Sequence, residues 1–110
     1  MDEIKIIWSD FSLDQIEDIA TELEKESFQA AQNVVTAIYD RPEQIKMQPL
    51  SGTPEPYLKE LELGHRFLLA YTYKIIYRML DDNTAYITDV FPTRKDPKKI
   101  KLRAKETDSL

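Results

Sequence analysis

The chain contains no cysteine, one histidine and two glycines among its 110 residues. Without thiols it can form neither a disulfide framework nor a thiolate metal site, which fits a reducing compartment. A single histidine disfavours a zinc site, because zinc needs several nitrogen or sulfur ligands. Two isolated glycines exclude a glycine-rich phosphate-binding loop. We therefore expect no metal, no cofactor and no small-molecule ligand.

Long hydrophobic runs are also absent from the sequence. No segment approaches the roughly 20 apolar residues that a transmembrane helix needs. The chain opens Met1-Asp2-Glu3 and so lacks the basic start of a signal peptide. We expect a cytoplasmic protein that makes no contact with a membrane. Residues 1–110 suit one domain with its own core.

Charge is distributed unevenly along the chain. Residues 1–58 carry four Lys/Arg and twelve Asp/Glu, whereas residues 59–110 carry eleven and eight. The acidic half is typical of helices with solvated outer faces. From Arg94 to Lys105 there are seven cations and one anion. This pattern defines a basic C-terminal segment, residues 94–110, suited to a polyanion or an acidic partner.

The segment YKIIYRML, residues 73–80, alternates in the period of a β-strand. Tyr73 and Tyr77 share the face that we expect in the core. Lys74 and Arg78 share the other face, where we expect solvent. Asp81-Asp82-Asn83 then breaks the pattern, and residues 85–91 form a second strand-like run, so the two runs predict a hairpin.

Two helices are predicted upstream of this hairpin. Ser12 can cap a helix over residues 12–26, and Ser27 can cap a second over residues 27–41. Pro42 should end the second helix at or near Asp40 or Arg41. The expected apolar stripe of the second helix is Phe28, Ala31, Val34, Val35 and Ile38.

The remaining segments complete an α+β pattern. Residues 3–8 and 66–70 are predicted strands, residues 42–56 a loop, and His65 an exposed turn residue beside Gly64. The order β-α-α-β-β-β predicts a two-layer fold with two antiparallel helices packed on one face of a mostly antiparallel four-stranded sheet. The residues expected to be largely buried are Ile16, Leu23, Val35, Ile38, Ile75 and Tyr77. Asp96-Pro97 predicts the start of a short basic helix reaching Lys105.

Four sequence pieces in series resemble one known family. They are IIWS from Ile6, LGHRFLL from Leu63, YKIIYR from Tyr73 and ITDVFPTRKDPKKI from Ile87. The chain resembles toxins of the RelE/ParE superfamily from bacterial type II toxin–antitoxin modules, such as those that stabilise plasmids. The resemblance implies a growth-inhibiting toxin with the fold above and a cognate antitoxin that wraps and silences it.

Candidate partner-binding residues follow from the basic segment and from the sheet face opposite the helices. We expect Leu68, Ile76 and Leu80 to lie on that face as apolar contacts. The full candidate set is Arg66, Leu68, Ile76, Leu80, Arg94, Lys95, Lys98, Lys99, Lys101 and Arg103.

The superfamily holds two activities. RelE-like members cut messenger RNA in the ribosome, whereas ParE-like members poison DNA gyrase and lack the nuclease residues. Metal-independent RNA cleavage needs cations around the reacting phosphate. Lys74, Arg78 and Arg94 are the candidate catalytic residues if this chain is an endoribonuclease.

Three features favour the ParE-like branch. Lys74 stands where RelE-like toxins usually have an arginine, no aromatic residue follows Phe91, and the chain is acidic overall. We therefore favour a toxin that binds a cellular protein, with DNA gyrase as the candidate target. One alternative is a ribosome-dependent nuclease acting on messenger RNA. The other is a non-toxic interaction module that retains the fold.

Overall fold

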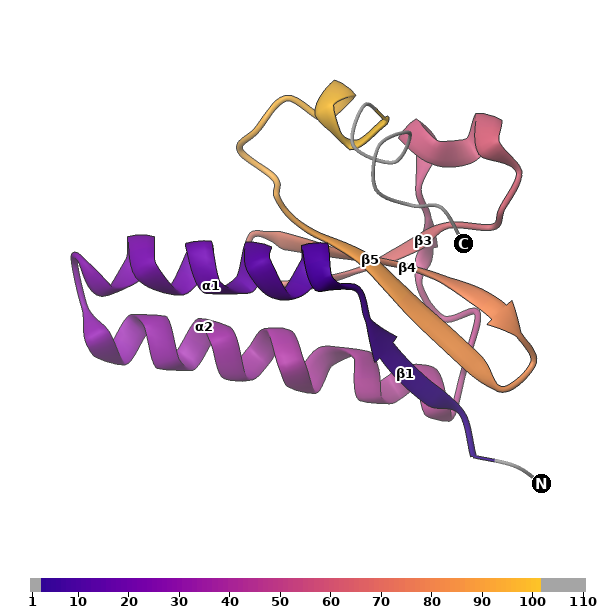
Figure 1. The fold of residues 1–110 in the computed structure, drawn as a ribbon, viewed down its shortest axis with the longest axis horizontal. Helices are drawn as coiled ribbons and strands as arrows, with labels where there is room; N and C mark the ends of the chain where they lie inside the picture. Colours follow the sequence, from indigo (N-terminus) through magenta and orange to yellow (C-terminus); the bar gives the residue numbers. More distant parts are fainter. Residues whose placement is uncertain (1–2, 102–110) are drawn as a thin grey trace.

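A computed structural model describes residues 3–101, in which two helices pack against one mixed sheet (Figure 1). The elements in chain order are β1 (Lys5–Trp8), α1 (Asp10–Glu24), α2 (Phe28–Asp40), the 3-10 helix η1 (Arg41–Lys46), β2 (Thr53–Pro54), the 3-10 helix η2 (Pro56–Leu61), β3 (Arg66–Ala70), β4 (Tyr73–Asp81) and β5 (Thr84–Pro92). The predicted two-layer α+β fold is confirmed. None of the described helices is long and apolar enough to cross a membrane.

Serine side chains start both long helices. The Ser9 hydroxyl accepts a hydrogen bond from Ser12 N at 3.0 Å, so the cap of α1 lies three residues before the predicted cap. Ser12 lies in the first turn instead, and its hydroxyl donates to Ser9 O. Ser27 caps α2 as predicted by accepting from Ala30 N. Pro42 follows the last residue of α2 by two positions, also as predicted.

The sheet has the strand order β1-β5-β4-β3-β2. The pair β1–β5 is parallel, and the other pairs are antiparallel. The fifth strand is a correction, because Thr53–Pro54 lies in the predicted loop and pairs with β3. The same loop also contains η1, in which Pro42 occupies an early position that needs no N–H donor.

The main core lies between the helices and the sheet. Ile16, Ile38, Ile75 and Tyr77 are buried in it as predicted. Leu23 and Val35 are only partly buried and pack at its edge, so their predicted burial is too strong. Trp8 packs on Tyr39 of α2 with ring centroids 5.0 Å apart, which joins the edge strand β1 to the helix layer.

A β-bulge in β5 fixes α1 to the sheet. The register between β4 and β5 shifts after Ile76, so Thr88 has no partner directly opposite. The Ser9 hydroxyl donates to the carbonyl of Thr88 at 3.1 Å. Gln15 Oε1 accepts from Val90 N at 2.7 Å. The bulge thus directs backbone groups of β5 toward the first two turns of α1.

Replacing Ile75 by Ala should lower the free energy of unfolding by about 2–5 kcal/mol, because the side chain is fully buried under the helices. Urea denaturation measures this loss. The exposed Leu63→Ala variant is the matched control and should change stability by less than about 0.5 kcal/mol. A loss below about 1 kcal/mol for Ile75→Ala would contradict the core assignment.

Candidate functional site

The sheet face away from the helices is covered by a second apolar cluster. Its buried members are Leu58 of η2, Ile76 of β4, Phe91 of β5 and Ile100 near the C-terminal end. Lys101 forms an ion pair with Glu60 of η2 at the edge of this cluster. Figure 1 shows η2 and the last described residues together on one side of the sheet, away from α1 and α2. This face is therefore not an open apolar platform.

Two of the three apolar contacts predicted on this face need correction. Leu68 pairs directly with Ile75 in the β3–β4 register and is buried with it in the main core. Directly opposed residues share a sheet face, so the placement of Leu68 opposite the helices is wrong. Ile76 lies on the predicted face but is fully buried by η2 and Ile100. Leu80 is 37% exposed near the end of β4.

Lys74 occupies a mostly buried ion pair, which corrects its predicted exposure to solvent. Its Nζ lies 2.9 Å from Glu55 Oε1, and the Glu55 side chain is fully buried. The same ammonium lies 4.3 Å from the centre of the Phe67 ring, a cation–π contact. The second Glu55 oxygen accepts from Tyr57 N at 3.0 Å and caps η2. The positive charge of Lys74 is therefore paired with a carboxylate inside the fold.

The other two candidate catalytic cations lie in different surroundings. Arg78 lies on the same face of β4 as Lys74, as predicted, but it is buried rather than exposed. Arg94 is exposed and borders a shallow pocket against α1, beside Asp18 and Tyr73. Tyr73 belongs to the helix-side core, so Arg94 is not on the face of Lys74 and Arg78. The structure does not bring the three cations together around one open position.

One residue of the segment that leads into β3 also differs from expectation. His65 is buried, and its carbonyl accepts from Glu55 N at 2.9 Å, so the predicted exposed turn residue is wrong. Gly64 has a φ of +76°, which explains why a glycine is needed at this turn. The Arg66 guanidinium donates to the carbonyls of Leu50 and Gly52 at 3.1 and 2.8 Å.

The basic C-terminal segment carries the exposed cations among the candidate residues. Asp96 Oδ1 accepts from Lys98 N at 3.0 Å, as the predicted helix start requires, and residues 98–101 are helical. The exposed members are Arg94, Lys95, Lys98 and Lys99, while Lys101 is partly buried beside Glu60. Arg103 and the rest of the predicted helix lie outside the described residues.

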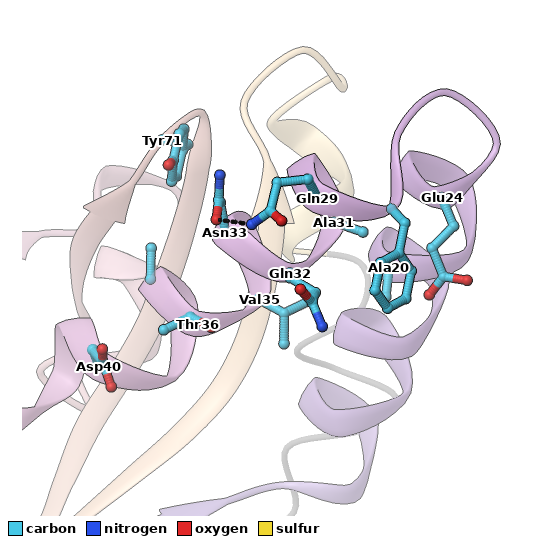
Figure 2. Close-up of a pocket in the computed structure, with 12 residues that line it drawn as sticks. Ala20, Glu24, Gln29, Ala31, Gln32, Asn33, Val35, Thr36, Asp40 and Tyr71 are labelled. Atoms are coloured by element: carbon cyan, nitrogen blue, oxygen red, sulfur yellow. Dashed lines mark hydrogen bonds between the residues drawn. The ribbon is translucent and has the colours of Figure 1, made fainter.

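A groove on the outer side of the helix pair was missed by sequence reasoning. Figure 2 shows α2 between α1 and the β3–β4 turn, with Tyr71 near Asn33 and a hydrogen bond from Gln29 Nε2 to Asn33 Oδ1 at 2.9 Å. Its lining residues are Ala20, Glu24, Phe28, Gln29, Ala31, Gln32, Asn33, Val35, Thr36, Ala37, Asp40 and Tyr71. Phe28 and Tyr71 are 65% and 64% exposed.

The sequence periodicity did not predict this groove, because it assigned Phe28 to the buried stripe of α2. Phe28 is the first residue of the helix, next to the Ser27 cap, and lies beyond the part of α2 that packs on the sheet. Tyr71 sits in the β3–β4 turn with a φ of +54°, an uncommon conformation for a tyrosine. A large apolar residue at each of these exposed positions is the signal that could have indicated a binding surface.

The described residues contain no group of three or more His, Cys, Asp or Glu side chains that could hold a metal ion. The features suited to binding are therefore the exposed cations near residue 94, the groove along α2 and the apolar loop of residues 47–52, which precedes β2. Each presents a surface rather than a cavity lined by reactive groups. Such surfaces are suited to binding a macromolecule.

The arrangement of helices and sheet is shared with a solved structure. It superposes on a chain of the chromosomal ParDE toxin–antitoxin system from P. aeruginosa with a TM-score of 0.66, covering 82% of this chain and 96% of that chain. The two sequences are 14% identical, so the likeness defines a common fold. The family model for the ParE toxin of the parDE type II toxin–antitoxin system matches residues 6–97. The chain belongs to this ParE toxin family. No curated protein sequence matches it significantly.

Removing one partner of the Glu55–Lys74 ion pair should destabilise the fold. We expect Lys74→Met to cost about 3–5 kcal/mol, because it leaves the buried Glu55 carboxylate without its counter-charge. Adding Glu55→Gln to Lys74→Met should recover part of this loss. Urea denaturation of the single and double variants measures the coupling.

Lys25→Met is the matched control, since Lys25 pairs with Glu22 in full solvent and should change stability by less than about 1 kcal/mol. A cost for Lys74→Met no larger than that of this control would contradict the structural role of the buried pair.

Proposed function

We propose that this ParE-family protein inhibits growth by binding a cellular target, with DNA gyrase as the first candidate, and that a cognate antitoxin neutralises it. The proposal excludes cleavage of messenger RNA as the toxic activity. It rests on the positions and partners of the cations that a nuclease of this superfamily would need.

The observation that supports this proposal most is that the positive charge of Lys74 is already paired with Glu55 within the fold. A metal-independent nuclease needs unpaired positive charge aimed at the reacting phosphate. The Lys74 ammonium instead contacts a carboxylate at 2.9 Å, and η2 covers the face on which it lies. Arg94 is on the helix side, so an RNA phosphate at Lys74 could not contact it as well. This geometry supports a protein-binding toxin.

The exposed cations of the basic segment supply the contact with the target in this proposal. Arg94, Lys95, Lys98 and Lys99 are exposed and lie within six residues of one another. Clustered exposed charge accelerates association with a surface of opposite sign and orients the encounter. An acidic patch on the target is the expected counterpart.

Reversing the charge of this segment should abolish toxicity while messenger RNA stays intact. We expect cells that express Lys95→Glu/Lys98→Glu/Lys99→Glu to grow normally, whereas the wild type arrests growth. Primer extension on a translated message and plasmid supercoiling, read in the same cells, measure the two possible activities. Lys25→Glu is the control for a charge reversal elsewhere on the surface.

Ribosomal A-site cleavage of the message by the wild type would contradict the proposal and make the nuclease alternative correct. Altered supercoiling with intact message would support gyrase as the target. Growth arrest with intact message and unaltered supercoiling would mean that the toxin binds a cellular protein other than gyrase.

The groove along α2 is the proposed docking site of the antitoxin. A disordered segment that folds on binding must bury a long apolar surface to offset its ordering cost. The groove offers Phe28 and Tyr71 as large exposed anchors, and the partly exposed Ala20 and Ala37 as small residues that let a backbone approach closely. The opposite sheet face, which sequence reasoning favoured for this role, is occupied by η2 and Ile100.

Truncating both anchors should weaken antitoxin binding. We expect Phe28→Ala/Tyr71→Ala to bind the antitoxin encoded beside this gene at least about tenfold more weakly, because exposed aromatic anchors dominate such interfaces. Isothermal titration calorimetry with the purified pair measures the affinity. Leu63→Ala, another exposed apolar residue away from the groove, is the control. Equal affinities for the two variants would contradict this placement.

A further inference from the structure

The loop that connects η1 to β2, residues 47–52, is held rigidly by side chains from three other elements. The buried Tyr77 hydroxyl of β4 donates to Pro49 O at 2.9 Å and accepts from Gly52 N at 3.0 Å. Arg66 of β3 donates to the carbonyls of Leu50 and Gly52. Gln44 Nε2 of η1 donates to the Ser51 hydroxyl at 2.8 Å.

Gly52 allows this close contact between the loop and the core. A Cβ atom at this position would lie 2.7 Å from Tyr77 Cε1 and 2.9 Å from Phe67 O. Both neighbours belong to the packed sheet and cannot move away cheaply. The loop conformation is thus fixed by the core, and it does not depend on a partner.

This fixed loop nevertheless holds two large apolar side chains in water. Met47 is 85% exposed and Leu50 is 64% exposed. Burying side chains of this kind would contribute favourably to the binding of a partner. Nothing in the packing of residues 3–101 uses that contribution, although the surrounding hydrogen bonds set the loop in place. A preformed apolar surface of this kind is typical of a binding site.

The charge around the loop limits the chemistry of what can bind. Four residues of the loop line a groove together with Met79 and Asp81 of β4 and with Asp82, and both aspartates are exposed. Met47 directly precedes these loop residues in the chain. Asp81 Oδ1 accepts from Asn83 N at 2.8 Å, which fixes that carboxylate within the turn. The groove therefore combines apolar lining residues with two exposed carboxylates.

We propose that this groove is a second contact for the cellular target and takes an apolar side chain that stands next to a lysine or arginine. The inference rests on the proposed protein-binding function. A target that handles nucleic acid presents basic residues on its surface, and these complement Asp81 and Asp82. A rigid, short groove fits a folded protein better than a disordered segment that must cover a long surface.

The test compares the two surfaces by substituting each in turn. We expect Met47→Ser/Leu50→Ser to lower toxicity at least about tenfold, measured as surviving colonies after induction, and to bind the antitoxin as well as the wild type. Phe28→Ala/Tyr71→Ala should show the reverse pattern, with toxicity retained and antitoxin binding weakened. Asp82→Lys, which alters only the charge, should also lower toxicity, whereas Asp14→Lys on α1 should not.

Unchanged toxicity of Met47→Ser/Leu50→Ser would overturn this inference and leave the proposed function standing. Loss of antitoxin binding together with toxicity would also overturn it, because the surface would then serve the antitoxin or the fold. Thermal unfolding of each variant separates these two cases. Failure of the proposed function itself would appear separately, as growth of the wild-type control or as A-site cleavage by it.

Discussion

The ion pair between Glu55 and Lys74 determines which surfaces of this protein are available. Glu55 is fully buried, and its two oxygens bind the Lys74 ammonium and the first turn of η2. Because a buried carboxylate is tolerated only with such partners, η2 must lie against the sheet. Leu58 then covers Ile76, and Ile100 completes the same cluster. Together these contacts cover Ile76 and Phe91 on this sheet face, whereas the helix layer and the loops present exposed apolar side chains.

This closure determines whether the cations of β4 can reach a ligand. A strand that carries cations on one face can offer them to RNA only while that face is open. Here β4 is buried on both faces along most of its length, with Tyr77 on one side and Ile76 on the other. The cations of β4 become structural, and the exposed positive charge lies at residues 94–99 instead.

Sequence periodicity predicted both long helices and four of the five strands, but not β2, the two 3-10 helices or the environments of the side chains. The alternation of residues 73–80 placed Tyr77 in the main core and Arg78 on the other face, and both placements are correct. It could not show that the other face is covered, because Leu58 and Ile100 are distant in sequence and neither segment has a strong periodic pattern. Leu68 was misplaced because a five-residue strand of apolar residues carries no alternation from which its face can be read. The groove along α2 and the loop at Leu50 depend on packing, which no single segment encodes.

The parallel pairing of β1 with β5 has a consequence for when the sheet can form. Residues 5–8 lie beside residues 84–87, so the first strand has no partner in the sheet until residues 84–87 have been synthesised. Contacts between such distant segments close large loops and form slowly. The edge strand β1 therefore joins the sheet late, and the complete sheet cannot form before β5 is available to pair with it.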